Sequence, residues 1–186
     1  RIKEEFNNKE TISAGEKGFN SKEKKFNFEK LKNNIMRMSG SQGVSEGAIN
    51  SKIDLYMSYP MTPATAVMHE LAAKQIENNL LVFQPENEIA VANAGLGASF
   101  AGAKTMIGSA GGGFDLMTEA LSFQGMSEIP LVVYLASRPG PGTGIPTYST
   151  QADLDVALRG GHGEFPRVVI APGDPIECIE KTNEAF

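Results

Sequence analysis

The sequence contains one cysteine, Cys178, and no tryptophan. A single cysteine can form neither an intrachain disulfide nor the thiolate ligand set of an iron–sulfur cluster, so any cluster must sit on another subunit or domain. No apolar run approaches the roughly 20 residues that span a bilayer, and the N-terminus has no hydrophobic stretch typical of a signal peptide. We therefore expect a soluble, cytoplasmic protein with no membrane partner.

Histidines are also scarce, and basic residues are few after Ser39. Neither His69 nor His162 has a second ligand at metal spacing, so we expect no metal site. Ten of the 17 basic residues precede Ser39, which leaves an acidic body with a pI of about 5.1 for the whole chain. In the basic tail Lys alternates with Glu, and the pattern predicts no nucleic-acid partner.

Composition divides the chain near residue 40. Residues 1–39 are rich in Asn, Lys, Glu and Gly without sustained periodicity, which predicts a linker or flexible arm. A short amphipathic helix over Asn27–Met38 is the one element expected there. Residues 40–186 are long enough for one well-buried domain.

Short apolar runs alternate with helical patterns in this domain. The expected strands are Ile53–Ser58, Leu80–Gln84, Lys104–Gly108, Leu131–Ala136 and Arg167–Ala171. The expected helices are Pro63–Asn78, Glu88–Ala101, Phe114–Gln124 and Asp174–Phe186. This alternation predicts an α/β fold with a doubly wound, mostly parallel sheet. The last helix shows no stop signal, so we expect the natural polypeptide to continue into a downstream domain.

Ligands of doubly wound sheets bind beyond the carboxyl ends of the strands, where four segments stand out. The first is Tyr59–Thr65, in which Thr62 could cap a helix and Pro63 could open it. The same hydroxyl could instead bind a carbonyl or carboxylate. The second is Gln84–Glu88, which leads into a helix of Ala and Gly; Glu86 and Glu88 could complement the helix dipole, or one could be a buried acid catalyst.

The other two segments are richer in glycine. Ser109–Phe114 fits neither the G-x-G-x-x-G pattern nor the P-loop, and we interpret it as a loop that a bulky ligand approaches closely. Ser137–Thr147 contains Arg138, which could clamp a carboxylate with two hydrogen bonds or could simply be solvated.

Taken in this order, the segments resemble the alpha subunits of 2-oxoacid:ferredoxin oxidoreductases, which act on 2-oxoglutarate and related acids. The resemblance runs from about Gly43 to the C-terminus. It rests on five blocks: Tyr59–Thr65, Glu86–Glu88 with its Ala/Gly helix, Leu116–Glu119 followed by Gly125–Pro130, Arg138–Thr147, and Thr150–Leu154. Residues before Ser39 resemble the linker that follows a gamma-type domain in fused family members.

The resemblance implies a thiamine diphosphate-binding fold in which two doubly wound domains face each other. This chain resembles the domain that holds the aminopyrimidine, and consistently it lacks the Gly-Asp-Gly segment followed by Asn that ligates magnesium. The diphosphate, Mg²⁺ and a 4Fe–4S cluster are accordingly expected on a partner beta chain. The implied reaction is oxidative decarboxylation of a 2-oxoacid to an acyl-CoA, with coenzyme A as acceptor and electrons passed to ferredoxin.

Residue by residue, the resemblance gives Glu88 the role of the catalytic carboxyl that hydrogen-bonds N1′ of the aminopyrimidine. For that role the acid should stay protonated near neutrality, which burial would favour. Thr62 and Arg138 match positions that grip the keto and carboxylate oxygens of the substrate. Tyr59, Pro60 and Gly112 are expected to line the aminopyrimidine end.

The glycine segment departs from the family pattern, which usually reads Thr-Ser-Gly-Pro-Gly where this chain has Gly108-Ser-Ala-Gly-Gly-Gly113. Two alternatives to the catalytic half-site stay open. One is a scaffold or binding domain that kept the fold and lost the chemistry. The other is a different class of thiamine diphosphate enzyme, such as a decarboxylase or a transketolase relative.

Overall fold

The structure is a computed structural model that describes residues 37–186. The arm expected over residues 1–39 and the helix expected over Asn27–Met38 therefore lie almost wholly outside the described residues. Within residues 37–186, no helix combines the length and apolarity needed to cross a membrane.

Four parallel strands form one sheet in the order β2-β1-β3-β4. They are β1 (Leu55–Ser58), β2 (Leu81–Phe83), β3 (Thr105–Ala110) and β4 (Val132–Ala136). The connecting helices are α5 (Thr65–Lys74), α6 (Glu88–Phe100) and α7 (Gly111–Ser127). Helix α4 (Gly40–Asn50) precedes the sheet, and α8 (Leu154–Arg159) and α9 (Pro175–Ala185) follow it. The expected doubly wound α/β fold is thus confirmed.

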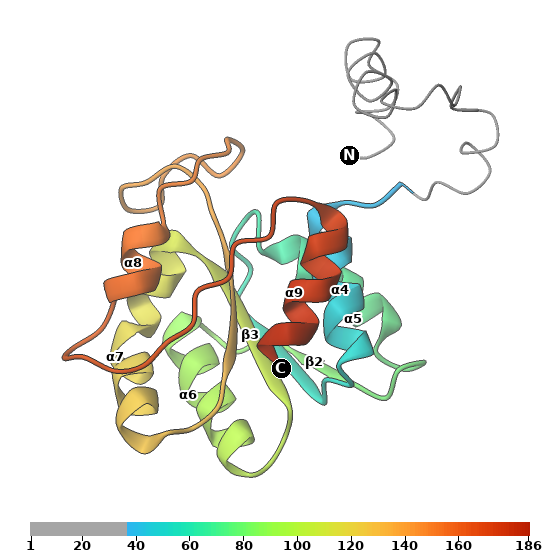
Figure 1. Cartoon of the computed structure of the whole chain (residues 1–186), viewed down its shortest axis with the longest axis horizontal. Helices are drawn as coiled ribbons and strands as arrows, with labels where there is room; N and C mark the ends of the chain where they lie inside the picture. The colour runs from blue at the N-terminus through green and yellow to red at the C-terminus, as the bar shows by residue number, and fades with distance from the viewer. Residues whose placement is uncertain (1–36) are drawn as a thin grey trace, which may run out of the picture. The chain divides into compact units, whose positions relative to one another are not determined.

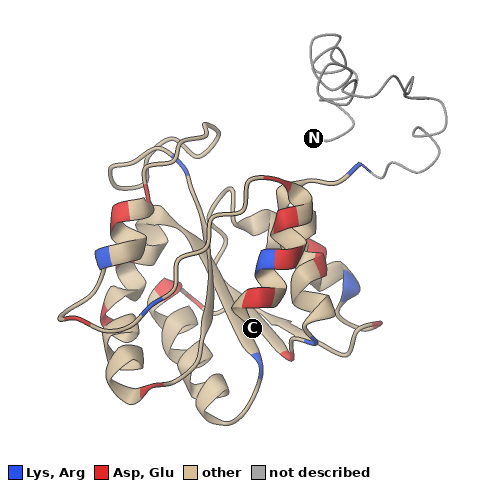
Figure 2. Cartoon of the chain, in the orientation of Figure 1, with Lys and Arg blue, Asp and Glu red and all other residues tan. Residues whose placement is uncertain are grey.

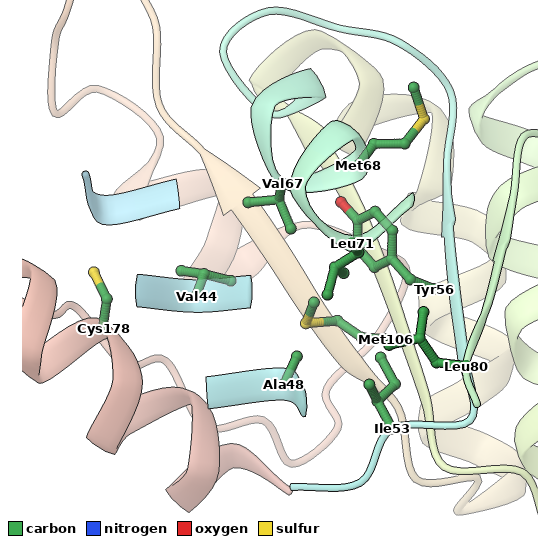
Figure 3. Packing of buried hydrophobic residues seen from close by; sticks show 10 residues of the cluster. All are labelled: Val44, Ala48, Ile53, Tyr56, Val67, Met68, Leu71, Leu80, Met106 and Cys178. Atoms are coloured by element: carbon green, nitrogen blue, oxygen red, sulfur yellow. The ribbon is translucent and has the colours of Figure 1, made fainter. Parts of the chain in front are cut away.

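The sheet is covered on both faces, with α4, α5 and α9 on one side and α6 and α7 on the other (Figure 1). Because successive residues of a strand point to opposite faces, each central strand contributes side chains to two hydrophobic cores. Tyr56 and Met106 enter the core under α4 and α5, which Figure 3 shows. Met57 and Ile107 enter the core under α6 and α7. This double burial explains why β1 and β3 are buried on both faces.

Tyr56 is fully buried in the first core, and its hydroxyl has no hydrogen-bond partner among residues 37–186. Burial raises the pKa of Tyr56 and outweighs the opposing effect of the nearby Ser58 hydroxyl. The ring lies across the neighbouring strand, where a Cβ at Gly108 would overlap the Tyr56 hydroxyl. Gly108 therefore gives the Tyr56 side chain its place on the sheet.

Helix α4 was not expected from the sequence because its glycines disfavour helix on propensity alone. The structure shows why they are there. A Cβ at Gly43 would overlap the Pro175 carbonyl, and a Cβ at Gly47 would lie 2.7 Å from the Ile179 carbonyl oxygen. The two glycines let α4 approach the backbone of α9, so tertiary contact outweighs the weak propensity.

The strand expected over Arg167–Ala171 is wrong, because this segment has no regular secondary structure. A strand forms only by pairing with a neighbour, and this segment joins no ladder of the sheet. Val168 is instead 87% exposed. The guanidinium of Arg167 donates to the carbonyls of Ala157 and Gly160 at 3.2 and 2.7 Å and stacks over the ring of Phe165.

Charge is distributed unevenly between the two helical layers (Figure 2). Helix α9 alone carries Glu177, Glu180, Lys181 and Glu184, whereas α6 carries one charged residue, Glu88. The exposed surface of α6 and α7 carries large apolar side chains together with the acids Asp115 and Glu119. Ile89, Phe100, Leu116 and Met126 are at least half exposed, and Phe123 is 47% exposed.

Two glycines of α6 offer a matched stability test. A Cβ at Gly95 would lie 2.6 Å from Ile107 Cγ2, whereas a Cβ at Gly97 meets nothing within 4 Å. We expect Gly95→Ala to lower the free energy of unfolding by about 1–2 kcal/mol through overpacking. Gly97→Ala should raise it by about 0.5–1 kcal/mol through helix propensity. Urea unfolding of both variants is the measurement, and shifts of the same sign would contradict the packing described.

Candidate functional site

The candidate residues converge because of the strand order. From β1 the chain moves outward to β2 on one side, while β3 lies on the other side of β1. Ligands of open α/β sheets bind at such a reversal, beyond the carboxyl ends of the strands. The segments that follow β1, β2, β3 and β4 all begin at this edge. The structure thus groups all four segments singled out from the sequence at the carboxyl ends of the strands.

Glu88, in the segment that follows β2, is the first residue of α6 and is 3% exposed. The helix is capped by Asn87, whose side chain accepts a hydrogen bond from the Ala90 backbone N–H at 2.9 Å. This cap fixes the first turn and directs Glu88 inward, while Glu86 is exposed. No residue that the structure describes offers a hydrogen bond to the buried Oε1 atom of Glu88. Buried polar atoms are nearly always paired, so an unpaired one is typical of a binding or catalytic group.

The glycine turn is not a loop but the first turn of α7, which begins at Gly111 and not at Phe114 as expected. A Cβ at Gly113 would overlap Ser109 Oγ and lie 2.7 Å from Glu88 Oε1. The missing side chain is what leaves room for the Glu88 carboxyl between α6 and α7. Gly113, more than Gly112, is therefore the glycine in contact with the acid.

Ser109 is a functional candidate that we did not single out from the sequence. It is 1% exposed, and strand alternation directs its hydroxyl to the α6 and α7 side of the sheet. Among the described residues, the Ser109 hydroxyl makes one weak contact, to Met61 Sδ at 3.9 Å. The signal in the sequence was a serine within the buried strand Thr105–Ala110, directly before the glycine turn.

Arg138 is 5% exposed, so the solvated arginine considered from the sequence is excluded. Its Nη1 atom donates to the backbone carbonyl of Thr62 at 2.7 Å. This bond ties the segment after β4 to the segment after β1 across the end of the sheet. The structure therefore brings the Thr62 backbone and the Arg138 guanidinium together.

The segment Tyr59–Thr65 differs from the expectation in one respect. Thr62 does not cap α5, because the helix begins at Thr65 and its cap position is Ala64. A cis Thr62–Pro63 peptide and a turn separate Thr62 from the helix. Thr62, Tyr59 and Pro60 are all exposed, and Tyr59 retains 36% of its accessible surface.

The loop after Arg138 returns over the glycine turn. A Cβ at Gly112 would lie 2.9 Å from the Gly142 carbonyl oxygen. Just before Arg138, the Ser137 hydroxyl donates to Asp153 Oδ2 at 2.8 Å. Gly112 therefore contacts the Arg138 loop, and Asp153 anchors the start of that loop.

A family model described as pyruvate flavodoxin/ferredoxin oxidoreductase, thiamine diP-binding, matches residues 46–186. The chain belongs to this family. The match covers the whole sheet and every site residue described above, so the fold is that of the family's thiamine diphosphate-binding domain. Within the described residues, no group of three His, Cys, Asp or Glu side chains could hold a metal ion.

Curated relatives share this region of the family. A 2-oxoglutarate synthase subunit KorA of Archaeoglobus fulgidus is 38% identical over 149 residues, which is 80% of this chain and 43% of that protein. A 2-oxoglutarate oxidoreductase subunit KorA of Mycobacterium tuberculosis is 45% identical over 128 residues, 69% of this chain and 19% of that protein. The chain thus spans less than half the length of these relatives.

A solved structure of the family has the same fold. The 2-oxoglutarate:ferredoxin oxidoreductase from Magnetococcus marinus, with 2-oxoglutarate, coenzyme A and succinyl-CoA bound, aligns with a TM-score of 0.77 and 40% identity. The alignment covers 80% of this chain and 26% of that chain.

The unpaired carboxyl of Glu88 should cost stability when no ligand is bound. Replacing Glu88 by Met, which is unbranched and of similar length, removes a buried oxygen that has no partner. We expect the free energy of unfolding to rise by about 1 kcal/mol. Chemical denaturation of the chain measures this change.

The matched control is Glu86→Met, because Glu86 is exposed next to the same helix terminus. Its effect should stay within about 0.5 kcal/mol. If Glu88→Met were the more destabilising of the two, the Glu88 carboxyl would have to be stabilised by a neighbour.

Proposed function

We propose that this chain is the aminopyrimidine-binding half of a 2-oxoacid:ferredoxin oxidoreductase active site, with a 2-oxoglutarate-like substrate. The observation that carries the proposal is the buried Glu88 Oε1 atom without a partner, beside the space left by Gly113. The names of the relatives and the ligands of the Magnetococcus marinus structure support the substrate class. The overall reaction converts a 2-oxoacid and coenzyme A to an acyl-CoA and CO₂, and two electrons pass singly to ferredoxin.

The residues fit the aminopyrimidine group. Glu88 would place its carboxyl against a ring nitrogen and hold a proton there, and the Gly113 backbone would let a flat ring come close. Thiamine diphosphate, when bound, supplies the carbon nucleophile for the keto carbon of the substrate. Tyr59, Pro60 and Gly112 would line the same end of the site.

Arg138 and Thr62 would hold the 2-oxoacid. One guanidinium donor of Arg138 is used by the Thr62 carbonyl, and the planar fork retains further donors for a carboxylate. The Thr62 hydroxyl lies on an exposed residue and is available to a keto oxygen. Because Arg138 is buried, its charge would attract the substrate carboxylate more strongly than a solvated arginine would.

The other half of the site would come from a beta chain. We assign Mg²⁺, the diphosphate and a 4Fe–4S cluster to that partner; the single cysteine of this chain cannot supply a cluster's ligands. The surface proposed to receive it is the apolar side of α6 and α7, formed by Ile89, Phe100, Leu116, Phe123 and Met126. Several exposed large apolar side chains are typical of the centre of an interface. Helix α7 also exposes Asp115 and Glu119.

Turnover tests the role of Glu88. In the complex reconstituted with its beta chain, Glu88→Gln keeps the shape of the side chain and removes its acidic proton. We expect ferredoxin reduction to fall about 100-fold or more, because proton transfer by a positioned group contributes that much. The exposed Glu86→Gln variant should retain activity.

Unchanged turnover in Glu88→Gln would eliminate the assignment. The two alternatives have their own readouts in the wild-type complex. A scaffold that lost the chemistry would release no heat on titration with thiamine diphosphate. A decarboxylase or transketolase relative would consume substrate without reducing ferredoxin.

A second experiment tests the partner surface. Phe123→Glu places a charge in the surface proposed for the partner. We expect the beta chain no longer to co-purify, because burying an unpaired charge costs on the order of 3–5 kcal/mol. Ile76→Glu is the control, since Ile76 is 94% exposed and follows α5 on the other side of the sheet. Equal co-purification of both variants would place the interface elsewhere.

A further inference from the structure

Asp153 lies between two segments of the site although it belongs to neither. Its Oδ2 atom accepts the hydrogen bond of the Ser137 hydroxyl at 2.8 Å. Its Oδ1 atom lies 2.5 Å from the position that a Cβ at Gly111 would occupy. The carboxyl is thus packed between the start of the Arg138 loop and the first residue of α7.

Helix capping does not explain this placement. Asp153 occupies the N-cap position of α8, yet its side chain makes no capping hydrogen bond there. The carboxyl turns away from its own helix and toward α7. An aspartate at an N-cap ordinarily uses its side chain for the helix that it begins, so this one serves a different contact.

The N-terminus of α7 is suited to receive it. The cap position there is Ala110, which has no side-chain acceptor, and the first residue is Gly111. A carboxylate near the positive end of a helix is favourable, and a side chain at position 111 would displace it. Gly111 and Asp153 are therefore fitted to each other.

The Asp153 contact is linked to Thr62, on the other side of the site, through Ser137 and Arg138. Asp153 holds Ser137, Ser137 precedes Arg138 in the chain, and Arg138 donates to the Thr62 carbonyl. We propose that Asp153 is a positioning residue that fixes Ser137, and with it the guanidinium of Arg138, relative to the glycine turn of α7. The inference rests on the proposed function in that Arg138 is taken to bind the carboxylate of the 2-oxoacid.

Loss of the Asp153 carboxyl should therefore act on the substrate and not on the cofactor. In the complex with the beta chain, we expect Asp153→Ala to raise the KM for the 2-oxoacid roughly tenfold, because small displacements of a clamping group weaken its hold. The dissociation constant of thiamine diphosphate should stay near that of the wild type. Asp153→Asn, which keeps an acceptor oxygen for Ser137, should recover most of the lost affinity.

The control is Asp155→Ala, an exposed acid on the same helix, which should leave KM unchanged. Ser137→Ala should reproduce the effect of Asp153→Ala, and the double variant should be no worse than either single one, because both remove the same contact. Additive effects, or equal losses in substrate and cofactor affinity, would overturn the proposal.

Hydrogen exchange separates this proposal from the proposed function, because it needs no turnover. In the full-length protein, Asp153→Ala should speed amide exchange in residues 138–147 while Asp153→Asn and Asp155→Ala should not. Unchanged exchange in Asp153→Ala would refute the positioning role even in an active complex. Faster exchange in a complex with no activity would leave the positioning contact supported and the proposed function refuted.

Discussion

The burial of the Glu88 carboxyl between two helices is the constraint on which the rest of the site depends. An acid at a helix N-terminus normally stays in water, where the helix dipole and solvent both stabilise it. Here the Asn87 cap sets the first turn of α6, and Gly113 provides space at the first turn of α7. A side chain at position 113 would fill that space and push the carboxyl out. One cap and one missing Cβ therefore produce a buried acid with an unpaired oxygen.

The remaining site groups are held by contacts that cross from one strand end to the next. Arg138 would be costly to bury alone, and the Thr62 carbonyl gives it a fixed partner without neutralising its charge. A partner that is a carbonyl and not a carboxylate leaves the positive charge available to an anionic ligand. The Ser137–Asp153 hydrogen bond holds the residue directly before Arg138. The Thr62 carbonyl, the Ser137 hydroxyl and the Asp153 carboxylate thus hold Arg138 in place. The proposed substrate would pair with the positive charge of Arg138.

Much of this arrangement could be predicted from the sequence because parallel sheets obey simple rules. Apolar runs such as Leu131–Ala136 identified four of the strands, and the rule that ligands bind at strand ends pointed to the segments that the structure brings together. The choice between Glu86 and Glu88 could not be made from residue types, since both suit a first helical turn. It depends on the phase of α6 against the sheet, which only the packed structure fixes.

Where the structure departs from the local sequence pattern, the common physical cause is that tertiary contact outweighs that pattern. The glycines of α4 look like helix breakers until α9 packs against them. Arg167–Ala171 has the composition of a strand, but a strand needs a neighbour, and Arg167 is bonded to the carbonyls around Gly160 instead. Thr62 has the right type for a cap, but the helix starts three residues later. Asp153 shows the same in reverse, because it stands at a cap position and bonds elsewhere.

Helix α6 joins the buried acid to the surface proposed for the partner. Its inner side carries Glu88 at the first turn and Gly95 against Ile107, and its outer side carries Ile89 and Phe100. The Glu88 oxygen is already shielded from water in this domain, so it depends on a ligand for its hydrogen bond. The stability lost at that oxygen is small in the isolated domain, on the order of 1–3 kcal/mol. In a closed assembly the same unpaired oxygen would favour any ring that offers it a nitrogen, so the acid that weakens the isolated fold would strengthen the assembled site.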